Sequence, residues 1–231
     1  MDNIVGRVAV ITGASSGIGK EIAKAMHSMG FRVVLAGRNR KRLNQVAMHM
    51  RKYESLIVEI DMTQRQEVEA LIAKAIEYFG RVDILVNSAG LSLSSQITSH
   101  QVEDWDAMID TNLKGTLYAI NAVLPHFQQY KEGHIINLAS ISAEEVTKDS
   151  TVYSAPKAAV QMISRGLEKD LARTGIKVTS ILPGMVDTPM TEQSDFGGRK
   201  KLETYDIAES IRYAITQPPH VNVNQITIRP V

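Results

Sequence analysis

The chain of 231 residues contains no cysteine. Disulfide bonds, thiolate metal ligands and cysteine nucleophiles are therefore excluded. No apolar run approaches the roughly 20 residues that a membrane-spanning helix needs, and no charged-then-apolar leader precedes Gly6 and Arg7. The formal net charge of +1 gives no general reason to expect nucleic acid or an anionic surface as a partner. These absences predict a cytoplasmic protein with no membrane or nucleic-acid partner.

The sequence does contain an alternation of short apolar strands with amphipathic helices, and it shows no internal domain boundary. Strands that are nearly continuous apolar runs are typical of a parallel sheet whose two faces are both covered by helices. The sequence therefore predicts an α/β fold, a single doubly wound domain over residues 1–231. The expected strands span residues 8–11, 32–36, 55–60, 82–86, 134–139, 176–182 and 225–229, and the longest expected helices span 102–129 and 151–173.

The first strand and helix are joined by a loop with three glycines, Gly13, Gly17 and Gly19. This order brings backbone N–H groups and the positive end of a helix dipole to one point, which suits a diphosphate. Glycine is needed because a Cβ would hold the phosphate away from the backbone. The spacing G-x-x-x-G-x-G differs from the usual dinucleotide fingerprint, so a tight turn without a ligand is the alternative.

The residue at the end of the second strand predicts which dinucleotide is bound. An acid there accepts a hydrogen bond from the 2′-hydroxyl of the ribose, whereas an arginine faces a 2′-phosphate. Arg38 occupies this position, and no acid occurs between Gly30 and Tyr53, which favours NADP over NAD. The alternatives for residues 38–42 are a solvated basic helix start, which would oppose the helix dipole, and a nucleic-acid patch, which would need interleaved aromatic residues.

Unusual residues also follow the ends of other strands, namely Asp61, Asn87–Gly90, Ser140 and Pro183–Gly184. The carboxyl ends of parallel strands meet at one edge of the sheet, and ligands bind along that edge. Asp61 is expected to face the adenine amino group or simply to precede the next helix. Thr63 and Gln66 have the spacing of a capping box that would open this helix.

Tyr153 and Lys157 are spaced so that a phenol and an ammonium lie on one face of a helix. Pro156 is disruptive inside a helix but tolerated in its first turn, so Tyr153 is expected at or just before the helix start. The Lys157 cation and the positive helix end would then favour the phenolate, which makes Tyr153 a candidate acid–base catalyst. Taken alone, such a pair is more often an ordinary surface feature.

Together with Ser140, these motifs resemble the short-chain dehydrogenase/reductase family, and the resemblance runs from about Arg7 to the C-terminus. The resemblance implies a Rossmann-type parallel sheet of about seven strands in the order 3-2-1-4-5-6-7. It also implies an NADP(H)-dependent oxidoreductase that interconverts a carbonyl and an alcohol by hydride transfer. The motifs, weak singly and specific jointly, are Thr12–Gly19, Asn87–Gly90, Asn112 in TNLKG, Ser140, Tyr153-x-x-x-Lys157, and Pro183-Gly184 with Thr188.

The resemblance implies a role for each matched residue. Tyr153 would be the acid–base, Ser140 would hold the substrate oxygen, and Lys157 would bind the nicotinamide ribose and lower the pKa of the tyrosine. Asn112 would fix a water that links Lys157 to solvent, and no metal is implied. The implied cofactor-binding residues are Gly13, Ser15, Ser16, Gly17, Ile18, Gly19, Arg38, Asp61, Met62, Asn87, Ala89, Gly90, Tyr153, Lys157, Pro183, Gly184, Val186 and Thr188.

The substrate is expected among residues 91–98, 141–150 and 185–204, the last being the substrate-binding loop. A substrate with a carboxylate could use Arg199, Lys200 and Lys201, although a solvated loop explains these cations equally well. The chain length and the C-terminal NQITIRP resemble relatives that act on 3-hydroxy acids and small aldehydes or ketones, which is analogy alone.

Two alternatives to an NADP(H)-dependent enzyme stay open from the sequence. One is an NAD-dependent alcohol dehydrogenase of the same family, and the other is a sensor or scaffold that holds NADP without reacting. The resemblance also implies a homo-oligomer, a dimer or a tetramer, formed through the helices near 102–129 and 151–173.

Overall fold

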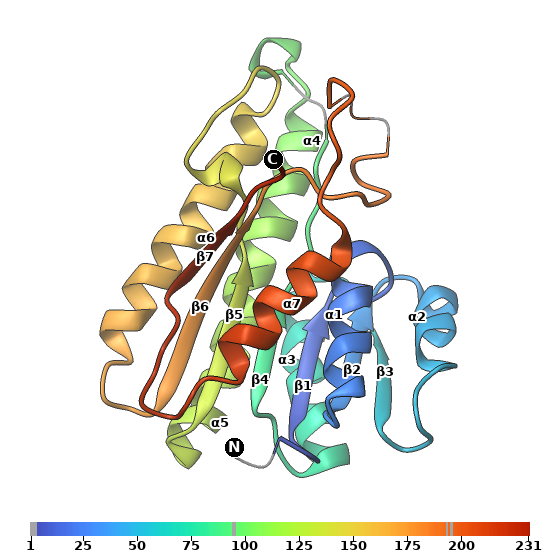
Figure 1. Cartoon of the computed structure of the whole chain (residues 1–231), viewed down its shortest axis with the longest axis vertical. Coiled ribbons are helices and arrows are strands. Elements are labelled where there is room, and N and C mark those ends of the chain that lie inside the picture. The colour runs from blue at the N-terminus through green and yellow to red at the C-terminus, as the bar shows by residue number, and fades with distance from the viewer. Residues whose placement is uncertain (1–3, 94–95, 193, 195) are drawn as a thin grey trace.

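The computed structural model describes residues 4–93, 96–192, 194 and 196–231, so residues 94, 95, 193 and 195 of the expected substrate loops lie outside the described residues. The strands form one parallel sheet in the order β3-β2-β1-β4-β5-β6-β7, which confirms the prediction (Figure 1). The strands are β1 (Val8–Thr12), β2 (Arg32–Gly37), β3 (Ser55–Glu59), β4 (Ile84–Asn87), β5 (Gly133–Leu138), β6 (Ile176–Pro183) and β7 (Gln225–Ile228).

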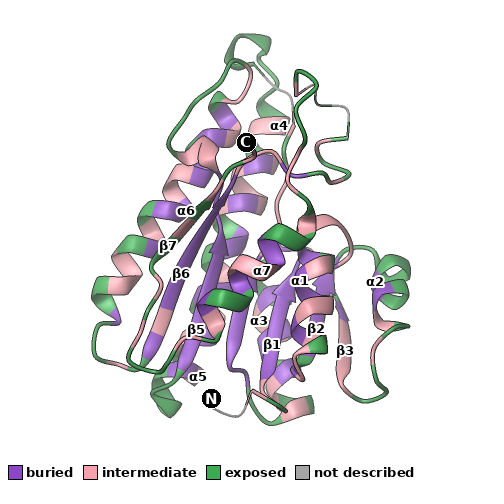
Figure 2. Cartoon of the chain, viewed as in Figure 1, coloured by how far each residue is buried: buried purple, intermediate pink, exposed green. Residues whose placement is uncertain are grey.

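Helices cover both faces of this sheet. They are α1 (Gly17–Ser28), α2 (Arg40–Ala47), α3 (Arg65–Phe79), α4 (Val102–Ile109), α5 (Gly115–Tyr130), α6 (Thr151–Asp170) and α7 (Thr204–Ile215). Side chains of successive strand residues alternate between the faces, so in β1 Ile11 packs toward α1, α2 and α7, whereas Val10 packs toward α3 and α5. Figure 2 shows the result: the central strands are buried, and exposed residues lie on the outer sides of the helices. No helix within the described residues has the length and apolarity that crossing a membrane requires.

The helix predicted over residues 102–129 contains one irregular turn. α4 and α5 are joined by a π-helical segment, Asp110–Lys114, in which Asn112 is buried. Single π-helical turns inside α-helices often mark functional sites. Gly115 directly follows this segment, and a Cβ on it would lie 3.0 Å from the carbonyl oxygen of Met62. The irregular turn therefore packs closely against the end of β3.

The capping box predicted for Thr63 and Gln66 is wrong. α3 begins at Arg65, and the turn before it is held by Asp61, whose carboxylate accepts hydrogen bonds from the backbone N–H and the hydroxyl of Thr63, both at 2.9 Å. Glu67 accepts a hydrogen bond from the N–H of Asp61 at 2.7 Å. Aspartate side chains readily accept from the N–H two residues further on, and this local bond occupies the threonine.

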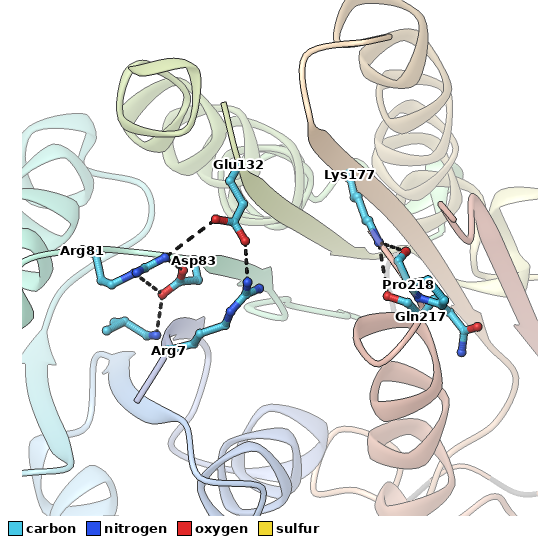
Figure 3. A network of polar contacts seen from close by, with 8 residues as sticks. Arg7, Arg81, Asp83, Glu132, Lys177, Gln217 and Pro218 are labelled. Atoms are coloured by element: carbon cyan, nitrogen blue, oxygen red, sulfur yellow. Dashed lines mark hydrogen bonds and ion pairs between the residues drawn. The ribbon is translucent and has the colours of Figure 1, made fainter. Parts of the chain in front are cut away.

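Charged residues hold the opposite edge of the sheet, where the strands begin (Figure 3). The buried carboxylate of Asp83 accepts hydrogen bonds from the N–H of Val8 at 2.8 Å and from Nε of Arg81 at 2.9 Å. Glu132 pairs with Arg7 at 2.5 Å and with Arg81 at 3.9 Å. This network ties together the starts of β1, β4 and β5, at the edge remote from the strands' carboxyl ends.

Candidate functional site

A cleft of about 500 Å³ opens at the carboxyl edge of the sheet, between the glycine loop and the ends of β2, β3 and β4. Because every strand pair is parallel, residues that follow different strands meet at this edge. The predicted cofactor residues that line the cleft are Gly13, Ser15, Ser16, Gly17, Ile18, Gly19, Arg38, Asp61, Met62, Ala89, Gly90 and Thr188.

The glycine loop packs directly against the segment that follows β4. A Cβ on Gly13 would lie 2.8 Å from the Cα of Ala89, and the φ of Gly13 is +67°. The hydroxyl of Thr12 secures the same contact, because it accepts the backbone N–H groups of Ser88 and Ala89, each at 3.1 Å. Within the described residues, Ser16 makes no side-chain cap bond to α1, and the first helical turn holds no acid. The free N–H groups and the positive dipole end of α1 are thus available to an anion in the cleft.

Two arginines line the cleft where β2 ends. Arg38 was predicted there, and Arg42 of α2 is an addition to the predicted set. The side chain of Asn39 accepts the N–H of Arg42 at 3.0 Å, which places Arg42 in the first helical turn. Among the described residues, neither guanidinium has an acidic partner, and the first turn of α2 contains no acid. Unpaired guanidiniums are suited to a phosphate group. The asparagine cap before the arginine run was the signal that could have identified Arg42.

Asp61 both lines the cleft and holds the turn before α3, so its two sequence-based interpretations are compatible. Thr111 also lines the cleft but was not among the predicted residues. Thr111 belongs to the π-helical segment, whose register departs from regular helical spacing. No periodicity argument could therefore have placed this residue at the cleft.

Six of the predicted cofactor residues do not line the cleft. Tyr153 and Gly184 line a neighbouring pocket, and Lys157 lies behind Gly90. The other three belong to the framework around the sheet. Asn87 is buried within the sheet, where its side-chain amide donates to Asn137 at 2.9 Å and thus joins β4 to β5. Pro183 is the last residue of β6. Val186 is buried and forms an isolated parallel bridge with Leu202. In this structure these side chains support the framework around the cleft.

A second pocket of about 460 Å³ adjoins the cleft, and Met190 lines both. Ser140, Tyr153 and Gly184 line this second pocket, and the hydroxyl of Ser140 is near enough to the phenol of Tyr153 to lower its pKa. Oγ of Ser140 also accepts the N–H of Ser142 at 3.1 Å, which orients it. The two hydroxyl groups can therefore bind one oxygen atom of a ligand.

Burial raises the pKa of Tyr153 above its ordinary value, and the hydroxyl of Ser140 partly opposes this rise. The expected lowering of this pKa by Lys157 is not found, because burial dominates and Nζ of Lys157 lies 5.9 Å from the centroid of the ring. Lys157 is itself buried, and burial lowers the pKa of its ammonium to about 8. At neutral pH the arrangement is thus a protonated phenol near a buried cation.

Lys157 and Asn112 lie directly behind Gly90, a residue of the cleft wall. A Cβ on Gly90 would lie 3.7 Å from Nζ of Lys157 and 3.4 Å from Oδ1 of Asn112. The amide of Asn112 exchanges two hydrogen bonds with the backbone of Leu91: the N–H of Leu91 donates to Oδ1 at 2.7 Å, and Nδ2 donates to the carbonyl oxygen at 2.8 Å. Asn112 therefore attaches the segment after β4 to the π-helical turn, beside the buried ammonium.

Pro156 lies in the second turn of α6, so its predicted place in the first turn is wrong. α6 is capped by Ser150, and the N–H of Ser154 already donates to the carbonyl oxygen of Ser150 at 2.8 Å. Pro156 lacks the N–H that would bond to the carbonyl of Val152. Tyr153 still stands in the first turn of the helix, close to its predicted place.

The two ends of the loop between β6 and α7 are joined by hydrogen bonds, and the middle of the loop lines the second pocket. The N–H of Leu202 donates to the carbonyl oxygen of Met185 at 2.9 Å, and the N–H of Asp187 donates to that of Leu202 at 2.8 Å. Further along the loop, Phe196 and Arg199 line the second pocket. The loop predicted over residues 185–204 is therefore joined at its stems and contributes to the pocket of Ser140 and Tyr153.

Comparison with known proteins extends these observations. A sequence model of the family described as short chain dehydrogenase matches residues 7–196. An uncharacterized oxidoreductase of Staphylococcus haemolyticus (strain JCSC1435) is 61% identical over 231 residues, which are 100% of both chains. The closed form of a serine dehydrogenase complexed with NADP+ has a TM-score of 0.91 and 33% identity, over 96% of this chain and 94% of that one. An alcohol dehydrogenase of the archaeon Thermococcus sibiricus, complexed with 5-hydroxy-NADP, has a TM-score of 0.89 and 27% identity, over 97% of each chain.

Proposed function

The chain belongs to the short-chain dehydrogenase family of oxidoreductases, and we propose that it interconverts a carbonyl and an alcohol by hydride transfer with NADP(H). One observation carries this proposal. Ser140 and Tyr153 together line a pocket that adjoins a cleft suited to a dinucleotide. A substrate oxygen held by the pair would lie next to a nicotinamide bound at the junction, where Met190 lines both spaces.

NADP fits the residues of the cleft. The free N–H groups at the start of α1 would bind the diphosphate, and Arg38 with Arg42 would bind the 2′-phosphate. Lys157 would bind the nicotinamide ribose from behind Gly90, since its Nζ lies just below that wall. When bound, the cofactor supplies or accepts the hydride. The NADP+ of the serine dehydrogenase and the 5-hydroxy-NADP of the alcohol dehydrogenase support this choice over NAD.

Tyr153 would act as the acid–base of the reaction. Its phenol is protonated at neutral pH, since burial raises a pKa that already lies near 10, and a protonated phenol can donate to the carbonyl oxygen as the hydride arrives. Ser140 would hold that oxygen and orient it toward the phenol. In the reverse direction the phenolate must accept a proton from the alcohol, so alcohol oxidation should accelerate with rising pH. The Ser140 hydroxyl and the Lys157 ammonium would stabilise the phenolate as it forms.

The proposed substrates are small 3-hydroxy acids, aldehydes or ketones and the corresponding alcohols. They would be bound by the second pocket and by the loop over residues 185–204. Hydrogen bonds hold the two ends of this loop together, and Phe196 of the loop lines the pocket. The likeness to a serine dehydrogenase supports a 3-hydroxy acid, since serine is a hydroxy acid of this kind. The cavity of about 460 Å³ suits a molecule of this size next to a nicotinamide.

The test is a screen of carbonyl and alcohol substrates with NADPH absorbance as the readout, repeated with NADH. We expect NADPH oxidation with at least one carbonyl compound, and a rate at least about 100-fold lower in the Tyr153→Phe variant. Tight NADPH binding without turnover on any substrate would instead identify a sensor or scaffold. Faster turnover with NADH than with NADPH would overturn the choice of cofactor.

We further propose that the chain forms a homo-oligomer through α4, α5 and α6. Large apolar side chains are exposed along these helices, including Val102, Leu117 and Met162. Light scattering coupled to gel filtration should give the mass of a dimer or tetramer, and Leu117→Arg should reduce this mass. A monomer for the unmodified chain would contradict the proposal.

A further inference from the structure

Three charged side chains line the pocket of Ser140 and Tyr153: Glu145, Arg199 and Arg229. Arg229 donates to both carboxylate oxygens of Glu145, at 3.1 and 2.9 Å, so these two charges compensate each other. The ion pair also lowers the pKa of Glu145, which keeps its carboxylate charged. Arg199 is the charge that remains uncompensated within the described part of the pocket.

Arg199 is placed at the pocket by a tight turn. Gly197 and Gly198 have φ angles of +62° and +73°, and the N–H of Arg199 donates to the carbonyl oxygen of Phe196 at 3.3 Å. Two successive residues of positive φ define a type I′ turn, which favours glycine at both positions. The turn folds the Arg199 guanidinium over the Phe196 ring, 4.1 Å from its centroid, and Nε donates to the carbonyl oxygen of Phe196 at 3.3 Å. No acid of the described residues pairs with the terminal nitrogens of this guanidinium.

The two lysines that follow Arg199 are engaged elsewhere. Nζ of Lys200 pairs with Glu203 at 2.9 Å, and Nζ of Lys201 donates to the carbonyl oxygen of Thr191 at 2.6 Å. Neither lysine lines the pocket. Three neighbouring cations that are equivalent in the sequence thus differ in the structure, and Arg199 is the one oriented for a ligand.

We propose that Arg199 determines specificity by binding a carboxylate on the substrate, which would be an acid that also carries the reacting carbonyl or alcohol. The proposal rests on the hydride-transfer function proposed above. A planar guanidinium matches a carboxylate with two parallel N–H···O bonds, and the contact with the Phe196 ring restricts the movement of the guanidinium. Hydroxyl groups of the same pocket, on Ser92, Ser142 and Ser194, offer further donors to the acid.

Arg199→Gln, with Lys200→Gln as the matched control, tests this proposal. Each protein is assayed with a 3-hydroxy acid and with its methyl ester, which retains the reacting group and lacks the charge. A hydrogen bond to a charged group contributes about 1.5–3 kcal/mol, so Arg199→Gln should lower kcat/KM for the acid roughly 10- to 100-fold, mainly through KM. The ester should react about equally with both variants and the unmodified chain. Arg199→Lys should restore part of the affinity for the acid.

Several results would overturn the assignment. Equal losses for acid and ester in Arg199→Gln would show that the arginine only shapes the loop. If Arg229→Gln lowered kcat/KM for the acid but not for the ester, and Arg199→Gln changed neither, Arg229 would be the residue that binds the carboxylate. Tighter binding of a phosphate ester than of the acid would exclude a carboxylate site.

Calorimetric binding of the acid to the NADP+-loaded chain separates this inference from the proposed function. Acid binding that depends on Arg199 without any turnover would overturn the proposed reaction and leave the carboxylate site. Turnover of neutral carbonyl compounds without any binding of acids would overturn the carboxylate site and leave the reaction.

Discussion

Nζ of Lys157 donates a hydrogen bond to the carbonyl oxygen of Leu138 at 2.7 Å, and this bond joins α6 to the end of β5. α6 carries Tyr153, and Ser140 follows β5. The contact therefore fixes the distance between the two elements that present the hydroxyl pair. Since burial lowers the pKa of Lys157 to about 8, the donor is an ammonium at neutral pH and loses its charge in mildly alkaline solution.

Substitution of Lys157 should change how stability depends on pH. Folding lowers the pKa of this lysine from 10.5 to about 8, so between these values the unfolded chain binds more protons than the folded chain. Over this window the group should make the free energy of unfolding rise with pH, by up to about 1.4 kcal/mol per pH unit. Urea unfolding between pH 7.5 and 10.5 should show this contribution in the unmodified chain and not in Lys157→Met. Lys74→Met, on the exposed side of α3, is the control, and identical pH slopes for all three proteins would contradict the prediction.

Tyr153→Phe should remove turnover while preserving cofactor binding. The variant lacks only the hydroxyl, and general acid–base catalysis typically contributes about 100- to 10,000-fold. NADPH oxidation should fall by a factor in this range, and the affinity measured by NADPH fluorescence should stay the same. Tyr205→Phe on the exposed side of α7 should leave both quantities unchanged. Turnover retained by Tyr153→Phe would exclude this residue as the proton donor.

Arg38→Gln should weaken NADPH binding without affecting NADH. Loss of a charge-assisted hydrogen bond to a phosphate costs about 1.5–3 kcal/mol, which corresponds to a roughly 10- to 100-fold higher Kd for NADPH. Arg42→Gln should act in the same direction, because Arg42 lines the same part of the cleft. Arg40→Gln is the control from the same basic run, since Arg40 lies outside the cleft. Fluorescence titration with both cofactors gives the comparison, and a parallel loss of NADH affinity in Arg38→Gln would refute phosphate recognition.

His134 should make the protein sensitive to acid. Its ring is buried, with Nε2 at 2.7 Å from Oγ1 of Thr179, and burial together with Lys177 lowers its pKa from 6.5 to about 3. As pH falls below 6.5, the unfolded chain takes up a proton that the folded chain does not. Stability should therefore decrease toward pH 3 by up to about 1.4 kcal/mol per pH unit from this residue. His134→Gln should be less stable at pH 7 and show a shallower acid slope, whereas the exposed His49→Gln should keep the original slope.

The fold could be predicted because its signals are local and repeated. Strands such as β1 and β5 are mostly apolar and are buried along their whole length, and the glycine loop marks the first crossing from strand to helix. Each strand end then had to lie at the same edge, which brought Arg38, Asp61 and Gly90 to one cleft. The arrangement follows from the parallel pairing of the strands.

Choices between competing local bonds could not be predicted in the same way. Thr63 had the spacing of a helix cap, but Asp61 two residues earlier bonds both its N–H and its hydroxyl. Pro156 was assigned to a first turn by a rule that holds on average, yet α6 begins earlier. The pKa of Tyr153 depends on burial by distant segments, and burial outweighed the charge of a close sequence neighbour.

The bridge between Val186 and Leu202 brings the two ends of the intervening segment together beside the sheet. Within this segment Thr188 and Met190 line the cleft, and Met190 and Phe196 line the second pocket. One closed segment therefore contributes walls to both spaces. A change in its length or composition should alter the shape of the cleft and of the second pocket together.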